Sequence, residues 1–409
     1  MLAVLTTHPI QYQVPIWRAL AARGRVPFEV LYLSDHGLAP SYDPGFGQAH
    51  AWDIGLTDGY AHHFIDCIRG PRQDSFWWLR LGPALTRRLQ ASGARILWTQ
   101  GWQVAAYWQA VWQAKALGLD TWLRAETNLK SSGTGWRRLA KDPLLTALLQ
   151  RIDRFLAIGK ANRQFYLARG IPPARIVEAP YCVDNARFRA QAARLRAERD
   201  QLRAAWGIPR DAFCLLFVGK LIGKKRPLDL IDAARALGAH AGSRPLHLLV
   251  VGTGDLLPEV RARCSIVHDG SSGAASRPTQ GQVRASLTGF LNQSEIARAY
   301  VAADCLVLPS EATETWGLVV NEAMACGLPA VVSEACGCCD DLVKPYRPDL
   351  CFPPGDTERL ARAIQAVVAQ PPSSADVASL IERYDVIRTA EAVEQLYAAT
   401  IAARRGAAA

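Results

Sequence analysis

The strongest constraint on the fold is a repeated alternation of short apolar runs with longer amphipathic stretches along most of the chain. A short apolar run bounded by turn residues is typical of a buried strand, and a longer amphipathic stretch is typical of a helix. The strand candidates are MLAVLTT, FEVLYLS, RILWTQ, DTWLRAET, RFLAIG and RIVEAP, then AFCLLFVGK, LHLLVVGTG, ASLTGF, CLVLPS and PAVVSEA. Strands and helices in alternation favour an α/β fold built on doubly wound parallel sheets.

The alternation pauses once, at residues 178–188, and a charged stretch at 189–207 that we predict to be a helix leads into the second series. The chain has 409 residues, which is more than one hydrophobic core usually organises. We therefore predict one Rossmann-like domain over residues 1–185 and a second over 186–375. Residues 376–409 contain a final amphipathic helix and a frayed tail.

Charge and targeting signals narrow the class of protein. The formal net charge of +10 favours anionic partners, and because no nucleic-acid recognition module accompanies it, we do not expect a nucleic-acid partner. No apolar run approaches the roughly 20 residues that cross a bilayer, and the first residues do not read as a signal peptide. We therefore expect a cytoplasmic protein. Residues 264–283, rich in Gly, Ser, Thr and Pro, are predicted to form a surface loop.

The ten cysteines lie mostly inside apolar runs. We expect free buried thiols in a reducing compartment rather than a disulfide framework. Cys336, Cys338 and Cys339 form a cluster, but they lack a spaced second Cys/His pair, which argues against a metal site.

Two lysines follow the first strand candidate of the second domain, in the run GKLIGKKRP. Ligands of open α/β sheets bind beyond the carboxyl ends of the strands, so residues in this place are candidates for a site. Gly219 allows close backbone approach, and the loop can bring Lys220 and Lys225 together around a diphosphate. A solvated basic loop is the alternative. The next strand candidate ends in GTGD, where Gly252 marks a tight turn or a weak phosphate loop.

The strand candidate ASLT is followed by GFLNQSEI. Phe290 and Leu291 would offer backbone groups and an apolar wall to a flat base, and Ser294 is a candidate helix cap. An ordinary junction between a strand and a helix is the alternative.

The stretch ETWGLVVNEAMACG places two carboxylates around a helix start that we predict near Thr315 or Trp316. The backbone N–H groups at such a start have no partner within the helix and favour a diphosphate. These groups belong to Trp316, Gly317 and Leu318. Glu314 and Glu322 would then accept hydrogen bonds from hydroxyl groups on the two sides of the diphosphate, those of the transferred sugar and of the ribose. The alternative makes Glu314 a helix cap and Glu322 a surface residue.

These motifs occur in one order, from FVGKLIGKKRP through GTG and GFLNQSEI to PSEATETWGLVVNEAMACGLPAVVSEACG. Over about residues 155–345 the chain resembles the donor domain of the retaining glycosyltransferases of family four, and Glu314 and Glu322 match that family's motif of two glutamates separated by seven residues. The resemblance implies the GT-B fold, in which two Rossmann-like domains face a central cleft. It implies that the second domain binds the nucleotide sugar, that the first binds the acceptor, and that the last helix crosses back to the first domain.

The resemblance also implies roles for the residues of the motifs. Lys220 and Lys225 would hold the diphosphate, Glu314 would contact the transferred sugar, and Glu322 would contact the ribose. It implies no metal and no cofactor besides the nucleotide-sugar substrate, because lysines and helix N–H groups stabilise the departing diphosphate. Retention of configuration is ascribed in this family to attack on the same face of the sugar, without a firmly placed enzyme nucleophile.

The first domain departs from the family pattern. THPIQYQVP, which contains His8, replaces a glycine-rich loop after the first strand, and the strand DTWLRAETN offers Arg124 and Glu126 in place of a sugar-contacting histidine. His8, Arg124 and Glu126 are therefore our candidates for the substrate-side contacts. A packed histidine, and a structural ion pair between Arg124 and Glu126, are the alternatives.

Residues 68–90 interleave arginines with Phe76, Trp77 and Trp78. This combination suits an anionic membrane surface or a lipid-linked acceptor. A helix that buries the aromatic side chains in the core is the alternative.

We therefore predict an enzyme that transfers a sugar from a nucleotide donor to a glycan, lipid-linked or small-molecule acceptor in cell-surface polysaccharide or glycolipid synthesis. The expected place is the cytoplasm, or the inner face of the cytoplasmic membrane. Two alternatives remain open: an epimerase or hydrolase of nucleotide sugars on the same fold, and a protein that binds a nucleotide sugar without catalysis.

Overall fold

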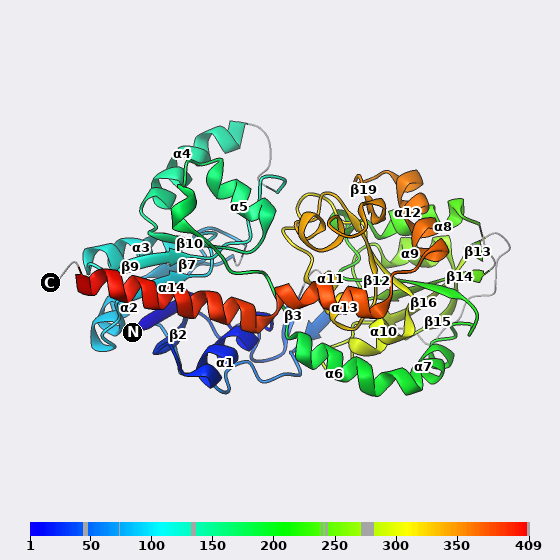
Figure 1. Ribbon diagram of the computed structural model, residues 1–409, viewed down its shortest axis with the longest axis horizontal. Coiled ribbons are helices and arrows are strands. Elements are labelled where there is room, and N and C mark those ends of the chain that lie inside the picture. The colour runs from blue at the N-terminus through cyan, green and yellow to red at the C-terminus, as the bar shows by residue number, and fades with distance from the viewer. Residues whose placement is uncertain are drawn as a thin grey trace. The chain divides into compact units, whose positions relative to one another are not determined.

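The computed structural model of the protein describes residues 1–43, 48–72, 74–131, 136–238, 240–241, 244–270 and 282–406 (Figure 1). The chain divides into two compact units. The first contains Met1–Ala39, Gly55–Tyr181 and Asp385–Ala409, and the second contains Pro40–Ile54 and Cys182–Tyr384.

The first unit is built on a parallel sheet of seven strands in the order β11-β10-β9-β8-β1-β2-β5. Its strands are β1 (Leu2–Thr6), β2 (Phe28–Tyr32), β5 (His62–Phe64), β8 (Ile96–Thr99), β9 (Asp120–Leu123), β10 (Arg154–Ala157) and β11 (Ile176–Glu178). Its helices are α1 (Val14–Arg23), α2 (Ala84–Ala91), α3 (Ala105–Ala116), α4 (Trp136–Gln150), α5 (Lys160–Leu167) and α14 (Val386–Gly406). A separate hairpin pairs β6 (Cys67–Arg69) with β7 (Leu79–Leu81).

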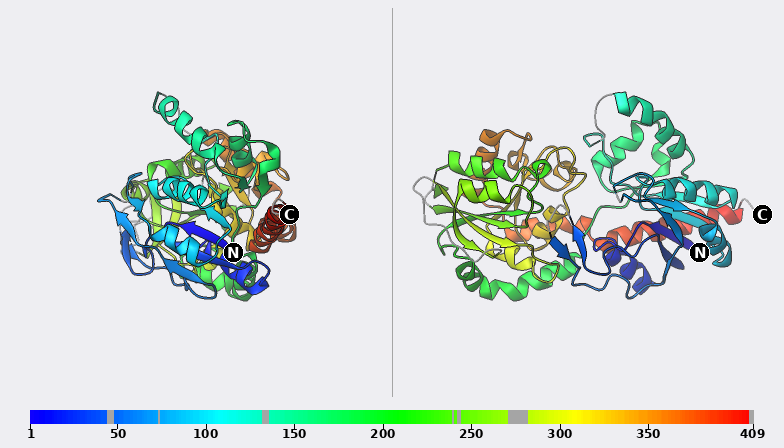
Figure 2. Two further views of the ribbon diagram at one scale, coloured as in Figure 1. Left: turned by 90° about the vertical axis from the view of Figure 1, so that its left-hand side faces the viewer. Right: turned by 180° about the vertical axis from the view of Figure 1, so that it is seen from behind.

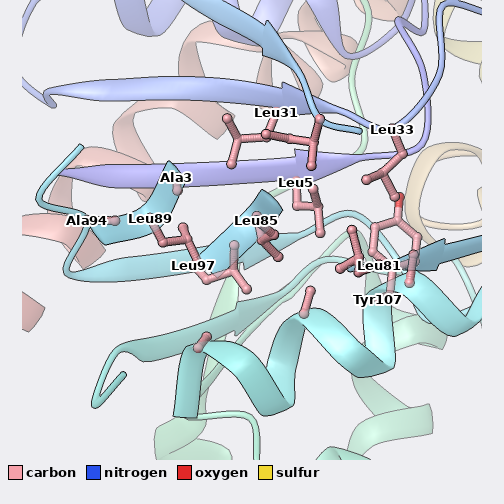
Figure 3. Close-up of a cluster of buried hydrophobic side chains, with 14 of the residues drawn as sticks. Ala3, Leu5, Leu31, Leu33, Leu81, Leu85, Leu89, Ala94, Leu97 and Tyr107 are labelled. Carbon is pink, nitrogen blue, oxygen red and sulfur yellow. The ribbon is translucent and has the colours of Figure 1, made fainter. Parts of the chain in front are cut away.

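One face of this sheet packs against α2, α3 and β7 (Figure 3). Leu5 and Leu31 from the sheet, Leu85 from α2 and Tyr107 from α3 are all buried in this cluster. The central strand β1 is buried along its whole length, which is what its continuous apolar run predicts for a strand covered on both faces.

The last helix, α14, belongs to the first unit although its sequence follows the second (Figures 1 and 2). It lies along α1. Arg23 on α1 donates two hydrogen bonds to the carboxylate of Glu394 on α14, at 2.6 and 2.9 Å, and Thr389 donates to the carbonyl of Pro180 at 2.7 Å. The predicted return of the last helix to the first domain is therefore what the structure contains.

The second unit is built on a sheet in the order β15-β16-β14-β12-β17-β18-β19, whose neighbours are all parallel, with the short β13 antiparallel to β14. The strands are β12 (Phe213–Val218), β13 (His240–Ala241), β14 (Arg244–Val251), β15 (Cys264–Asp269), β16 (Val283–Gly289), β17 (Cys305–Leu308), β18 (Ala330–Ser333) and β19 (Cys351–Phe352). The hairpin of β3 (Ser41–Asp43) and β4 (Gln48–His50) also belongs to this unit.

Helices cover both faces of the second sheet (Figures 1 and 2). One group consists of α8 (Pro227–Ala236), α9 (Leu257–Arg263) and α12 (Thr357–Ala369). The other consists of α6 (Asn185–Leu195), α7 (Arg199–Ala205), α10 (Ala297–Ala302), α11 (Leu318–Ala325) and α13 (Ser374–Ile381). The predicted α/β class with two parallel sheets is confirmed.

Two local predictions were wrong. Residues 264–269 form strand β15 rather than a loop, because Cys264 and Ile266 are buried and the strand pairs with β16; residues 271–281 of that predicted loop lie outside the described residues. The helix predicted at 189–207 is two helices, α6 and α7, with a 3₁₀ turn at Arg196–Glu198 between them.

The unit boundaries also differ from the predicted ones. The change of unit falls at Tyr181 and Cys182, Pro40–Ile54 packs with the second unit, and the return to the first unit begins at Asp385. Helix α13 therefore belongs with the second unit rather than with the terminal segment.

We predict that Glu394→Gln lowers the Tm of the full chain by a few degrees at pH 7. The bonds from Arg23 hold the pKa of the Glu394 carboxyl below its ordinary value of 4.5, so its contribution is present above that pH and is lost as the pH falls through the folded pKa. The difference in Tm between the variant and the wild type should therefore shrink below about pH 4.5.

Thermal unfolding followed by circular dichroism at several pH values measures this difference. Glu391→Gln is the matched control on the same helix, because Glu391 is 3.7 Å from Arg23 and more exposed. A Glu394→Gln difference that stays constant from neutral to acid pH would contradict the prediction.

Candidate functional site

The predicted donor-side residues follow four neighbouring strands of the second sheet. Along the sheet these strands lie in the order β16, β14, β12 and β17. Phe290 follows β16, Gly252 follows β14, Lys220 follows β12, and Glu314 lies in the loop after β17. Because all four strands are parallel, these residues lie in sequence along one edge of the sheet.

The glycines of this edge are required by close backbone packing. The N–H of Gly219 donates to the carbonyl of Val251 at 3.0 Å, and the N–H of Gly252 donates to the carbonyl of Gly289 at 2.8 Å. Gly252 has φ +126°, and a Cβ there would lie 2.0 Å from the carbonyl oxygen of Gly219. A side chain at this position would push the neighbouring loops apart. The close approach of the two backbones explains why the GTG motif has a glycine at position 252. It supports the interpretation of Gly252 as part of a tight turn.

Lys225 and Glu314 form an ion pair across the ends of β12 and β17. Their side chains are 20% and 16% exposed, so the pair is largely shielded but still reached by solvent. A backbone bond from the N–H of Glu311 to the carbonyl of Lys224, at 2.9 Å, ties the two loops together. The structure thus joins two residues that are separated by 88 others in the chain. Lys220 is half-buried beside Gly219.

Arg226, which the sequence did not single out, holds the same two loops. It has a left-handed backbone conformation, with φ +50°, and it comes directly before α8. Its guanidinium donates to both carboxylate oxygens of Asp229, at 2.6 and 3.2 Å, and lies 3.4 Å from an oxygen of Glu311. These bonds stabilise a conformation that non-glycine residues rarely adopt.

The helix after Glu314 begins later than predicted. α11 starts at Leu318 and is preceded by Gly317 with φ +104°, where a Cβ would lie 2.6 Å from Leu308 Cδ2. Thr315 and Trp316 therefore belong to the loop. The Trp316 side chain is buried and its indole donates to Asn321 at 2.8 Å, which makes it part of the packing under the loop. The left-handed turn at Gly317 separates this loop from the helix.

Glu322 lies within α11 and is 1% exposed. Tyr300 on α10 donates a hydrogen bond to its Oε2 at 2.5 Å. The alternative that made Glu322 an exposed helix residue is wrong. Glu322 is thus buried within α11, while Glu314 lies in the loop and pairs with Lys225.

The end of β16 carries Phe290 and Leu291, both half-buried. Trp52 packs against Phe290 with ring centroids 6.1 Å apart and planes at 59°. Ser294 is not the residue before a helix, since α10 is preceded by Ile296. Its backbone N–H and hydroxyl instead donate to the carboxylate of Asp53. Neither Trp52 nor Asp53 carried a sequence signal that linked it to its partner, which lies 238 positions later for Trp52 and 241 positions later for Asp53.

In the first unit, His8 follows β1 and lies close to His36, which follows β2, with ring centroids 5.2 Å apart. The Nδ1 of His8 is 2.9 Å from the hydroxyl of Thr7. Burial, together with the nearby imidazole of His36, lowers the pKa of His8 to about 4. His8 is therefore neutral near pH 7, so its imidazole can accept a hydrogen bond from a hydroxyl group or donate one to it.

Arg124 and Glu126 are linked through Tyr181. Arg124 is 3% exposed, donates to the carbonyl of Pro180 at 3.0 Å, and lies 5.2 Å from the centre of the Tyr181 ring. The Tyr181 hydroxyl donates to Glu126 at 2.5 Å. Burial and the Glu126 carboxylate hold the pKa of Tyr181 well above its ordinary value. Glu126 itself is exposed, whereas Arg124 is built into the unit.

The described part of the aromatic segment 68–90 runs from β6 through the connection that carries Phe76, Trp77 and Trp78 to β7, and then into α2. Phe76 and Trp77 are exposed, Trp77 by 61%, while Trp78 packs against the core cluster. The alternative of a helix that buries all three aromatic residues is therefore wrong. In the part of the chain that the structure describes, no helix is both long and apolar enough to cross a membrane.

All ten cysteines are free, and most are buried, as predicted. Among the described residues, no three or more His, Cys, Asp or Glu side chains are grouped so that they could hold a metal ion.

Two family models match the chain. Residues 9–182 match the model described as glycosyl transferase 4-like domain, and residues 198–383 match the model described as glycosyl transferases group 1. The two matches meet near the change of unit at Tyr181.

Curated relatives match over part of their length. A D-inositol 3-phosphate glycosyltransferase of Thermomonospora curvata is 33% identical over 195 residues, which is 45% of this chain and 42% of that protein. A GDP-mannose-dependent alpha-mannosyltransferase of Mycobacterium tuberculosis is 34% identical over 217 residues, or 53% of this chain and 48% of that protein. The chain spans about half the length of the curated relatives it matches.

Solved structures match over nearly the whole chain. Anabaena Alr3699/HepE in complex with UDP has a TM-score of 0.68 at 16% identity and covers 97% of this chain and 99% of its own. Sucrose-phosphate synthase from Thermosynechococcus elongatus has a TM-score of 0.64 at 19% identity, covering 98% and 99%. At these identities the likeness shows the GT-B fold. With both of its domains matched, the chain belongs to the group 1, family four-like glycosyltransferases.

Proposed function

We propose that the protein is a retaining glycosyltransferase that moves a sugar from a nucleoside diphosphate donor to a glycan, lipid-linked or small-molecule acceptor. The observation that carries this proposal is the pairing of Lys225 with Glu314 at the carboxyl edge of the second sheet. It unites a cation suited to a diphosphate with a carboxylate suited to sugar hydroxyls, in a chain of this family.

The bound donor would separate Lys225 from Glu314 and contact each of them in place of the ion pair. The diphosphate would take the ammonium group of Lys225, together with Lys220, and so release the Glu314 carboxylate to accept hydrogen bonds from the sugar. The charge that develops on the departing diphosphate would be stabilised by these lysines and by backbone N–H groups around Gly317 and Leu318. No metal enters this proposal, since the cationic groups supply the charge.

The first unit would position the acceptor. A neutral His8 can accept a hydrogen bond from an attacking hydroxyl, and Glu126 is the exposed carboxylate held by Tyr181. Arg124, whose Nε has no hydrogen-bond partner among the described residues, would orient the Glu126 carboxylate. Attack on the same face of the sugar, without an enzyme nucleophile, gives retention.

The names of similar proteins point to a chemical class of donor. The relatives' names include inositol 3-phosphate and GDP-mannose, and similar folds were solved with UDP and UDP-glucose. We propose a nucleoside diphosphate sugar as the donor and cell-surface polysaccharide or glycolipid synthesis as the pathway. The proposed place is the cytoplasm, with contact at the inner face of the membrane.

Lys225→Ala should reduce kcat/KM for sugar transfer by roughly 100- to 1,000-fold, because a preorganised cation is lost from the leaving group. Glu314→Gln should reduce it as well, by loss of the sugar contact. Transfer is measured with a panel of UDP-, GDP- and ADP-sugars, after a thermal-shift screen has identified the donor that binds.

Lys224→Ala is the matched control, because Lys224 is the exposed neighbour in the same loop. It should retain near wild-type transfer. Unchanged turnover in both Lys225→Ala and Glu314→Gln, with folding intact, would refute the proposal. Donor incubated without acceptor separates the alternatives: free sugar or an epimer as the main product would indicate a hydrolase or an epimerase.

Chelation should leave transfer unchanged within about twofold, since lysines and N–H groups stabilise the leaving group. The measurement compares initial rates after dialysis against EDTA with rates after adding back Mg²⁺ or Mn²⁺. A loss of activity that a divalent cation restores would show that the diphosphate is neutralised by a metal instead.

Trp77→Ser combined with Phe76→Ser should weaken sedimentation with anionic phospholipid vesicles, because the substitutions remove two exposed aromatic side chains from a loop that carries Arg72 and is flanked by Arg69 and Arg80. Trp112→Ser is the control, since Trp112 is also exposed, by 51%, but lies on α3. Equal sedimentation of all three proteins would argue against membrane contact through this loop.

A further inference from the structure

Residues 51–54 come from the N-terminal part of the sequence but pack within the second unit. The residues before Pro40 and after Ile54 belong to the first unit. The segment reaches the end of β16, where the proposed donor site has its apolar side. The proposed function assigns no role to this segment.

Two hydrogen-bonded anchors hold the segment on either side of Trp52. The side-chain amide of Asn292 donates to the carbonyl of Ala51 at 2.7 Å. The carboxylate of Asp53 accepts from the N–H of Ser294 at 3.1 Å and from the Ser294 hydroxyl. The chain is thus hydrogen-bonded to the turn that follows Phe290 on both sides of Trp52.

The side chain of Trp52 lies against Phe290. The ring centroids are 6.1 Å apart and the planes are tilted by 59°, which is a favourable aromatic contact. Both side chains are half-buried, so each keeps part of its surface accessible. Leu291, the next residue in the chain, is also half-buried. Trp52 and Phe290 thus form an aromatic patch at the carboxyl end of β16.

The order of the strands gives this patch a place relative to the charged groups. Glu314 follows β17, the lysines follow β12, and Phe290 follows β16, with β14 between the last two. Neighbouring strands are about 4.8 Å apart, so β12 and β16 are separated by roughly 10 Å. A donor laid along the edge with its sugar at Glu314 and its diphosphate at Lys225 would extend its ribose and base toward β16.

Resting on the function proposed above, we propose that Trp52 is a binding residue for the nucleobase of the donor. With Phe290 it forms the aromatic wall against which the base packs. A segment from the N-terminal part of the chain thereby contributes to the choice of donor. Base stacking on aromatic side chains is the interaction that this geometry offers, and the anchors at Asn292 and Ser294 preorganise it.

Isothermal titration calorimetry on the full chain tests this role with UDP, GDP and ADP, and with inorganic pyrophosphate, which lacks a base. Trp52→Leu should weaken binding of the best nucleotide by at least about fivefold and leave pyrophosphate affinity within about twofold. Trp52→Phe, which keeps an aromatic face, should retain most of the nucleotide affinity. Lys225→Ala should weaken both ligands, and Trp112→Leu should weaken neither.

Equal losses for nucleotide and pyrophosphate in Trp52→Leu, or no loss in either, would overturn the role of Trp52. A wild-type protein that binds none of the three nucleotides would overturn the proposed function, and this inference with it. Nucleotide binding that depends on Lys225 but not on Trp52 would leave the proposed function standing and reject only this inference. If Trp52→Leu fails to fold, Asp53→Ala, which removes one anchor, should weaken nucleotide binding without weakening pyrophosphate binding, and equal effects would again reject the role.

Discussion

The close backbone contact between the ends of β12 and β14 is the constraint on which the rest of the proposed site depends. Gly252 can adopt its left-handed conformation and approach the carbonyl of Gly219 only because it has no side chain. The same approach continues through the bond between Gly252 and Gly289. The ends of three strands are thereby held close together, with a register shift between β14 and β16 at Val250 and Val251, so the loops that carry the lysines and Phe290 begin from neighbouring points.

Several hydrogen bonds and ion pairs, rather than one, hold the loop after β12 to the loop after β17. The backbone bond from Glu311 to Lys224 and the guanidinium of Arg226 secure the loops, and the Lys225–Glu314 ion pair lies between them. A shielded ion pair that a ligand can replace has a useful consequence. In the proposed function, the two charged groups are partly shielded and already oriented before a donor binds, so less reorganisation would be needed on binding.

The first unit is organised differently. Of its candidate residues, His8 is kept neutral by burial, and Arg124 is buried beside the ring of Tyr181. Exposed Glu126 is the carboxylate that remains accessible there. This arrangement suits the recognition of hydroxyl groups better than the recognition of a diphosphate, in contrast to the cationic edge of the second unit.

The sequence alone determined the α/β class, the two domains and the order of the donor-side motifs, because strand periodicity and strand-end glycines are local properties of the chain. Lys225 and Glu314 could be named from their places after strands, and their residue types could be matched to a diphosphate and a sugar. Only the tertiary structure decided that these two side chains meet, that Glu322 is buried against Tyr300, and that α11 begins at Leu318. Only the tertiary structure brought Trp52 to Phe290, because contacts between residues more than 200 positions apart depend on how the whole chain packs and leave no local pattern.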